Sequence, residues 1–320
     1  MKFFLSALVV ASWATSANAE NLTFINIGSG SLDGGYYQTA KALCSSINSE
    51  NSGSVRCSPE PTSGSVYNLR MLQARELDFA FVQSDWQLAA YKGTGLFEGE
   101  KMSNLRSVMS LYPEAVTMLA GRDSEIFRSQ DIPGKKIDIG LASSGRHATA
   151  KEVLRRAGMN VAGYRGFYEL TVEQSIRGLC DGTIDASFLV LGHPSELVER
   201  ALSECGARII APSGPVLTRV FSESKGFVPI TIPADTYTNQ LGEIDTYAVY
   251  ATLVTRADMA SSEVAIVIES TLENLDSLKA QISQLSGLSW KNMATQGLSA
   301  PLHPASSVVL ENIQKKAAGN

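Results

Sequence analysis

Small polar residues and glycine gather where apolar segments of this 320-residue chain give way to helical spacing. Two such junctions are Thr62-Ser63-Gly64-Ser65 and Ser143-Ser144-Gly145. Backbone N–H groups in the first turn of a helix lack partners within the helix, and together with the helix dipole they attract an anion. We therefore expect both junctions to bind the anionic part of a small ligand, while N-capping is the alternative role of the same side chains.

A third junction, Gly28-Ser29-Gly30, follows an apolar run that predicts a strand. Its spacing to Gly34 is G-x-G-x-x-x-G, which differs from the dinucleotide fingerprint, so no nucleotide is expected. Ser29 and Gly30 suit a close approach of the backbone to a small ligand. Tyr36 is expected to form a wall of the same pocket, with packing in the core as the alternative.

Polar and charged side chains follow two further predicted strands. Gln83 and Asp85 are expected to read ammonium or hydroxyl groups of the ligand, although Asp85 also suits the cap of the next helix. Arg146 or His147, in the first turn of a predicted helix, is expected to contact a ligand carboxylate. A solvated helix face is the alternative for this pair.

Catalysis is not expected from this sequence. A hydrolase would need Ser144 as nucleophile with His193 or His303 as base, but the G-x-S-x-G motif is absent. His193 precedes Pro194, and we expect it to stand in a rigid turn and to offer a ring N–H donor to the ligand. The cysteine and histidine spacings match no zinc motif, so neither a metal nor a cofactor is expected.

Composition narrows the class of protein. A net charge of −5, with only three histidines and no cluster of Lys and Arg, argues against nucleic acid as a partner. The length exceeds one average domain, which predicts two lobes with separate cores. The four cysteines predict two disulfides, Cys44–Cys57 and Cys180–Cys205, the pairs nearest in sequence, although four cysteines allow three pairings.

The N-terminus reads as an export signal. Lys2 is followed by an apolar stretch from Phe3 to Trp13 and by the cleavage pattern Ala17-Asn18-Ala19. A membrane anchor would need about 18 or more apolar residues, and this stretch is shorter. We therefore predict that residues 1–19 are a signal peptide and that the mature protein is secreted to the periplasm.

Apolar runs alternate with segments of helical spacing, which predicts an α/β fold with parallel strands. The Ser- and Gly-rich junctions fall after strands, and the carboxyl ends of parallel strands share one edge of a sheet. Two crossings between lobes are expected near 113 and 249. Lobe 1 is expected to hold residues 20–113 plus 250–320, and lobe 2 residues 114–249.

Three local sequence patterns predict where individual strands and helices begin, end or break. The apolar stretch 106–120 is expected to be broken by Pro113 and Glu114. A capping box, Thr171-Val172-Glu173-Gln174, is expected to open a helix. Apolar residues at helical spacing from Val264 to Leu278 predict one long amphipathic helix.

Several sequence blocks resemble the TAXI family of solute receptors, which are the extracytoplasmic binding proteins of a subset of TRAP transporters. Blocks similar to those of the family begin with Gly28-Ser29-Gly30, Thr62-Ser63-Gly64-Ser65-Val66-Tyr67-Asn68, Leu77-Asp78-Phe79 and Gln83-Ser84-Asp85-Trp86. Later blocks are Pro113-Glu114, Ser144-Gly145, Leu179-Cys180-Asp181-Gly182, Ile184-Asp185-Ala186, Gly192-His193-Pro194 and Gly297-Leu298-Ser299-Ala300-Pro301-Leu302-His303-Pro304. The resemblance spans nearly the whole mature chain.

This resemblance implies a periplasmic binding protein type II fold, a monomer without enzymatic activity, and delivery of the ligand to TRAP membrane subunits. It implies a glutamate-like amino acid or a dicarboxylate such as 2-oxoglutarate as the ligand. Asp33, Gln38, Ala142 and the pair Arg146-His147 depart from the family pattern, so whether Arg146 or His147 contacts the ligand stays open. A periplasmic sensor subunit and a periplasmic hydrolase are the alternative functions.

Overall fold

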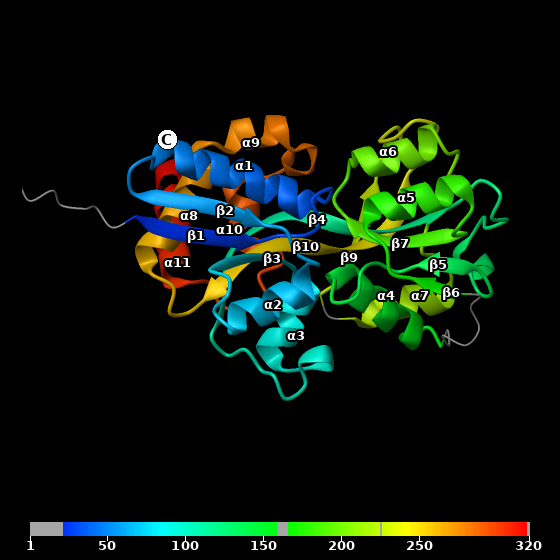
Figure 1. Ribbon diagram of the computed structural model, residues 1–320, viewed down its shortest axis with the longest axis horizontal. Helices are drawn as coiled ribbons and strands as arrows, with labels where there is room; N and C mark the ends of the chain where they lie inside the picture. Colours follow the sequence, from blue (N-terminus) through cyan, green and yellow to red (C-terminus); the bar gives the residue numbers. More distant parts are fainter. Residues whose placement is uncertain (1–21, 159–165, 225, 319–320) are drawn as a thin grey trace, which may run out of the picture.

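The structure, a computed structural model, describes residues 22–158, 166–224 and 226–318. Two lobes lie side by side along the long axis of the molecule, and two long strands run through both of them (Figure 1). This architecture confirms the predicted α/β fold with two lobes and two crossover strands. The predicted signal peptide, residues 1–19, lies outside the described residues.

Lobe 1 is built on three parallel strands in the order β2-β1-β3, namely β1 (Thr23–Gly28), β2 (Val55–Glu60) and β3 (Phe79–Gln83). Helix α1 (Gly35–Glu50) connects β1 to β2, and α2 (Ser65–Gln73) connects β2 to β3. Helix α3 (Ser84–Lys92) follows β3 directly. Because the carboxyl ends of parallel strands share one edge, these three helices all begin at that edge.

The crossover strands are β4 (Leu105–Ala120) and β10 (Ile244–Arg256), which pair with each other in antiparallel fashion. In lobe 1, β10 pairs with β3, and in lobe 2 it pairs with β9 (Val228–Ile232). The end of β4 pairs with β7 in lobe 2. The predicted lobe boundaries at 113/114 and 249/250 fall inside these two strands and stay predictions.

Lobe 2 repeats the alternation of strands and helices. Its other strands are β5 (Lys136–Asp138), β6 (Gly166–Tyr168), β7 (Ala186–Leu191) and β8 (Arg208–Ile210). Its helices are α4 (Gly145–Arg156), α5 (Val172–Asp181), α6 (Glu196–Ser203) and α7 (Pro215–Glu223). Strands β7, β5 and β6 are parallel neighbours, so α4 and α5 begin at the carboxyl edge that faces lobe 1 (Figure 1).

After β10 the chain returns to lobe 1 and ends in helices that cover its sheet (Figure 1). These are α8 (Ser261–Glu273), α9 (Leu275–Gln281), α10 (Trp290–Thr295) and α11 (Pro304–Ala318). Short 3-10 helices stand at Gly95–Phe97, Ser129–Asp131 and Ser283–Leu285.

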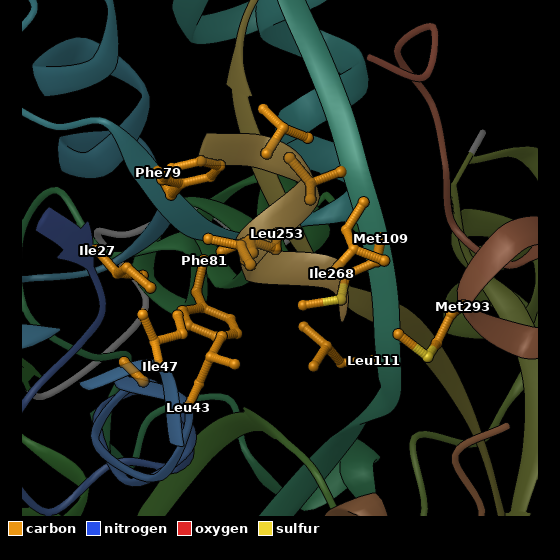
Figure 2. Packing of buried hydrophobic residues seen from close by; sticks show 14 of the residues in the cluster. Ile27, Leu43, Ile47, Phe79, Phe81, Met109, Leu111, Leu253, Ile268 and Met293 are labelled. Atoms are coloured by element: carbon orange, nitrogen blue, oxygen red, sulfur yellow. The ribbon is translucent and has the colours of Figure 1, made fainter. Parts of the chain in front are cut away.

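Strand β3 shows why the polar edge of lobe 1 is held in place. Phe79 and Phe81 are fully buried and point into the cluster that includes Leu43 of α1 and Ile268 of α8 (Figure 2). The intervening residues of β3 are buried on the opposite face, as both faces of a parallel sheet usually are. Each fully buried large apolar side chain stabilises the fold by about 1.5–3 kcal/mol. Packing on both faces therefore fixes the position of Gln83, where the strand ends.

Two predicted elements differ in the structure. The stretch expected to break at Pro113 and Glu114 is one continuous strand, because the pairing of β10 with β4 shifts register next to Pro113, where a missing N–H is tolerated. The helix expected from 264 to 278 is two helices. Asn274 separates them, since its side-chain amide donates to the Ser270 carbonyl at 2.9 Å and closes α8.

The local covalent and capping predictions are confirmed. The predicted disulfides are formed, joining α1 to β2 through Cys44–Cys57 and α5 to the segment after α6 through Cys180–Cys205. The capping box of α5 is also present. Gln174 N–H donates to Thr171 Oγ1 at 3.2 Å, and Thr171 N–H donates to Gln174 Oε1 at 3.0 Å. Each disulfide stays within one lobe, so neither of them fixes one lobe to the other.

Candidate functional site

A cavity of about 510 Å³ lies between the lobes. This volume falls in the range of roughly 300–1,000 Å³ that is usual for small-molecule sites. Residues of lobe 1 and of strand β4 that line it include Gly30, Asp33, Gly34, Tyr36, Gln38, Ser63, Gly64, Ser65, Gln83, Tyr112 and Glu114. Residues of lobe 2 that line it include Leu141, Ser144, Gly145, Arg146, Thr171, Val172, Ser195, Glu196 and Arg200.

Helices from both lobes begin at this cavity. The first residues of α1 and α2 in lobe 1, and of α4, α5 and α6 in lobe 2, line it. Glycine is the N-cap of α1 and of α2, and neither N-cap supplies a side-chain hydrogen bond. The first turns of α1 and α2 therefore begin at the cavity without a capping side chain, and their helix dipoles give this part of the cavity a positive potential without lysine.

The lobes touch where α2 and α4 begin. Tyr67 N–H donates to the Ser143 carbonyl across the gap at 3.1 Å. Gly145 packs so closely against lobe 1 that a Cβ on it would lie 1.8 Å from Gln83 Oε1 and 2.6 Å from Ser65 Oγ. A larger residue at position 145 would therefore displace the side chains of Gln83 and Ser65 from this contact.

A second polar contact between the lobes surrounds Asp85. The Trp86 indole N–H donates to the Gly145 carbonyl at 3.1 Å and to Thr149 Oγ1 at 2.9 Å. Thr149 Oγ1 in turn donates to Asp85 Oδ2 at 3.0 Å. Burial raises the pKa of Asp85 to about 6, while the hydrogen bond from Thr149 acts in the opposite direction. Asp85 thus belongs to the contact between lobes rather than to the lining of the cavity.

Further contacts close the opposite side of the gap. Asp33 Oδ2 accepts a hydrogen bond at 3.0 Å from Glu173 N–H in the first turn of α5. Gln284 Nε2 donates to the Pro194 carbonyl at 2.9 Å. The carboxylate of Asp33 lies at the positive end of the α5 dipole, which stabilises its charge. Lobe 1 therefore contacts lobe 2 on both sides of the cavity.

Glu114 brings a carboxyl group to the cavity from strand β4. The Tyr36 hydroxyl donates to Glu114 Oε2 at 2.6 Å. Burial raises the pKa of Glu114 to about 8, the hydrogen bond from Tyr36 lowers it, and the nearby charge of Asp85 raises it. The side chain of Glu114 is therefore mainly protonated at neutral pH as long as no cation approaches it.

Arg146 lines the cavity, but its charge is compensated inside lobe 2. Its guanidinium forms an ion pair with buried Asp138 and donates to the Phe188 carbonyl at 2.8 Å and to Ser175 Oγ at 3.1 Å. Burial lowers the pKa of Arg146 to about 9, and Asp33 raises it. The neighbouring His147 has Nδ1 at 3.0 Å from the Gly140 carbonyl and does not line the cavity.

Other predicted site residues do not line the cavity and form hydrogen bonds with neighbouring groups of the protein. Ser29 Oγ donates to the Glu60 carbonyl at 2.6 Å, and Thr62 Oγ1 donates to the Ser29 carbonyl at 3.0 Å. His193 Nε2 lies 2.7 Å from Thr117 Oγ1, its Nδ1 contacts the Tyr237 hydroxyl, and burial lowers its pKa to about 4. Of the predicted residues, Gly30, Tyr36, Ser63, Gly64, Ser65, Gln83, Ser144, Gly145 and Arg146 line the cavity, whereas Ser29, Thr62, Asp85, Ser143, His147 and His193 do not.

The cavity is also lined by Tyr112, Glu114, Thr171, Glu196 and Arg200, none of which was predicted from the sequence as a site residue. One signal for Glu114 was available. An acidic residue in the middle of a long apolar strand is costly to bury unless the site uses it. The residues of lobe 2 gave no comparable signal, because their position depends on how the lobes meet.

Two α/β lobes joined by two strands around a central cavity define the class, which is the periplasmic binding protein fold. Within this class the chain belongs to the NMT1-like family, whose model matches residues 27–311. It is similar to PhnD1 from Prochlorococcus marinus (MIT 9301) in complex with methylphosphonate, with a TM-score of 0.54, 12% identity, and coverage of 92% of this chain and 98% of that chain. It is also similar to a putative L-cystine ABC transporter protein from Listeria monocytogenes, with a TM-score of 0.51, 14% identity, and coverage of 83% and 97%.

These comparisons correct the family assignment. The predicted membership in the TAXI family is wrong, because the matching model is that of the NMT1-like family. The predicted TRAP-type partner and the glutamate-like ligand depended on that resemblance and are withdrawn with it. The motif blocks are compatible with the shared fold, since strand ends and helix starts in this fold place Ser, Thr and Gly at the same edges.

Within residues 22–158, 166–224 and 226–318, no three His, Cys, Asp or Glu side chains stand together in a way that could hold a metal ion. In the same segments no helix combines the length and the apolar character needed to cross a bilayer.

Proposed function

We propose that this chain is a periplasmic solute-binding protein of a membrane transporter and that it captures a small anionic solute between its lobes. The observation that carries this proposal is that helices from both lobes begin at one cavity of about 510 Å³. First-turn N–H groups bind an anion without a free cationic side chain. An anion held by α2 of one lobe and α4 of the other would join the two lobes.

Coupling of binding to closure follows from this placement. The lobes contact each other through hydrogen bonds, through the packing of Gly145 and through the apolar packing of Ala148 against lobe 1, and these contacts are not covalent links. Such contacts can open and close about the two crossover strands, as in hinged domain closure. A solute that binds both lobes would stabilise the closed arrangement by its differential affinity.

The contacts of the candidate nucleophile favour binding over catalysis. Ser144 Oγ accepts a hydrogen bond at 3.0 Å from His147 N–H and acts as the N-cap of α4. His193, which was the candidate base, contacts Thr117 and Tyr237 instead. A nucleophilic serine needs a base within hydrogen-bond reach.

The partner we propose is the membrane part of an ABC-type transporter. Support comes from the NMT1-like family match and from structural neighbours that include a putative ABC transporter protein. A receptor of this kind is expected to bind its solute stoichiometrically and to release it unchanged.

The test uses Gly145→Ala, with affinity measured by isothermal titration calorimetry. A thermal-shift screen of small carboxylates, sulfonates and phosphonates first identifies a solute that raises the unfolding midpoint. In Gly145→Ala the new methyl group would meet Gln83 and Ser65 when the lobes close, so we expect affinity to fall by about 100-fold.

Gly53→Ala is the matched control, because a Cβ at position 53 meets no atom within 4 Å. We expect this variant to bind like the wild type. Equal affinity of the wild type and Gly145→Ala would contradict closure of the lobes on the solute, and turnover of the solute would contradict a receptor.

A further inference from the structure

The cavity carries buried acceptor groups that the capture of an anion does not use. Glu114 lines the cavity and is 6% exposed, and Gln83 lines it and is 3% exposed. Gln83 is the last residue of β3, and Glu114 lies in the crossover strand β4. An anion would be repelled by an ionised carboxylate there, so Glu114 calls for a different part of the ligand.

Only one of the two carboxyl oxygens of Glu114 accepts a hydrogen bond from the described residues. Tyr36 donates to Oε2 at 2.6 Å, while the other carboxyl oxygen accepts no hydrogen bond from any described residue. The Tyr112 hydroxyl and the Asp85 carboxyl are the other titratable groups that act on Glu114. None of these three groups is a cation.

Gln83 Oε1 is also a buried acceptor without a hydrogen-bond partner among the described residues, but it lies against Gly145 where α2 and α4 meet. It therefore belongs to the contact between the lobes, and Glu114 is the acceptor that faces the cavity.

No cation of the protein balances Glu114. Among the described residues, Glu114 and Asp85 form no ion pair with Lys, Arg or His. The arginines that line the cavity have other partners, because Arg146 pairs with Asp138 and Arg200 pairs with Glu173 at 2.9 Å. A buried charge usually has a counter-charge.

We propose that the solute carries a protonated amine in addition to its anionic group, and that Glu114 accepts the ammonium N–H. This inference rests on the proposed function. The helix N-termini would hold the anionic end and Glu114 would hold the cationic end, so the solute would be a small zwitterion. The high pKa of Glu114 agrees with this assignment, because a carboxyl group without a counter-charge keeps its proton until a cation replaces it.

Matched pairs of probes test the assignment by calorimetry. β-Alanine is compared with propionate, taurine with ethanesulfonate, and 2-aminoethylphosphonate with ethylphosphonate. We expect at least one amine to bind about 30-fold more tightly than its amine-free counterpart, the usual size of a charge-assisted contact. We expect Glu114→Gln to remove most of that ratio.

Glu98→Gln is the control, since Glu98 is an exposed residue outside the cavity. Equal binding within every pair by the wild type would overturn the inference and leave anion capture intact, and this comparison does not require that Glu114→Gln folds. Tighter binding of the amine-free anions would have the same meaning. If no probe binds at millimolar concentration, the proposed function fails together with the inference.

Discussion

Arg146 and Glu114 reach the same cavity, but the protein treats their charges differently. Arg146 is 8% exposed and has a full set of partners inside lobe 2, including the ion pair with Asp138. Glu114 is equally buried and has one tyrosine hydroxyl as its partner. A charge that is compensated within its own lobe stabilises that lobe, whereas a carboxyl group without a counter-charge is available to the solute.

The largest effect on stability is expected from the removal of Asp138, which is 0% exposed. Asp138→Ala would leave the guanidinium of Arg146 buried without its counter-charge. We expect the free energy of unfolding to fall by about 3–5 kcal/mol, measured by urea denaturation. Glu152→Ala is the control, because Glu152 pairs with Arg155 and Arg156 at the surface, where such pairs contribute about 0–1 kcal/mol. Equal losses in the two variants would contradict a structural role for the Arg146–Asp138 pair.

The second-largest effect is expected in the pH dependence of stability, which reports whether Glu114 lacks a counter-charge in the folded protein. Its pKa is about 8 in the folded protein, compared with 4.5 for an ordinary glutamate side chain, so the folded state holds the proton more tightly. The contribution of Glu114 to stability is therefore fully present below about pH 4.5 and is lost as pH rises toward 8. We expect this loss to be on the order of 3 kcal/mol, measured by urea denaturation between pH 5 and 8 without solute.

Glu114→Gln supplies the reference for this pH series. Glutamine is neutral at every pH and keeps an acceptor for the Tyr36 hydroxyl. We expect the stability of the variant to fall less steeply over the same range. Identical slopes for the variant and the wild type would show that Glu114 does not hold its proton in the folded protein.

The contact between lobes gives the smallest expected effect. Thr149→Val removes one hydrogen bond to Asp85 and one acceptor for Trp86 while keeping the shape of the side chain. We expect affinity for the solute to fall about five- to tenfold, since a single hydrogen bond contributes about 1 kcal/mol. Calorimetry checks this, and an unchanged affinity would show that the contact does not stabilise the closed arrangement.

Local patterns in the sequence were sufficient for most of the fold. The alternation of apolar runs and helical spacing predicted β1, α1 and β7, and the Thr171 and Gln174 side chains predicted the start of α5. These features depend on neighbours within a few residues. The pairing of Cys44 with Cys57 was also within reach because the residues are close in the chain.

The site depended on contacts that local patterns do not contain. Arg146 was expected to meet a ligand carboxylate, but it pairs with Asp138 at the end of β5, the strand that precedes its helix α4. Glu114 was read as a break in an apolar stretch, although the strand continues through it. The family assignment failed for a related reason. Short Ser- and Gly-rich blocks are typical of the sheet edges in this fold, so they do not distinguish one family with the fold from another.

The most direct test of the difference between Arg146 and Glu114 counts the protons released when an amine-bearing solute binds at pH 7. Calorimetry in buffers with different ionisation enthalpies gives this number. Since the pKa of Glu114 is about 8, the group is mainly protonated before binding and ionises when an ammonium approaches. We expect the wild type to release about one proton per solute and Glu114→Gln to release almost none. Equal proton release by the two proteins would contradict the pairing of Glu114 with the solute.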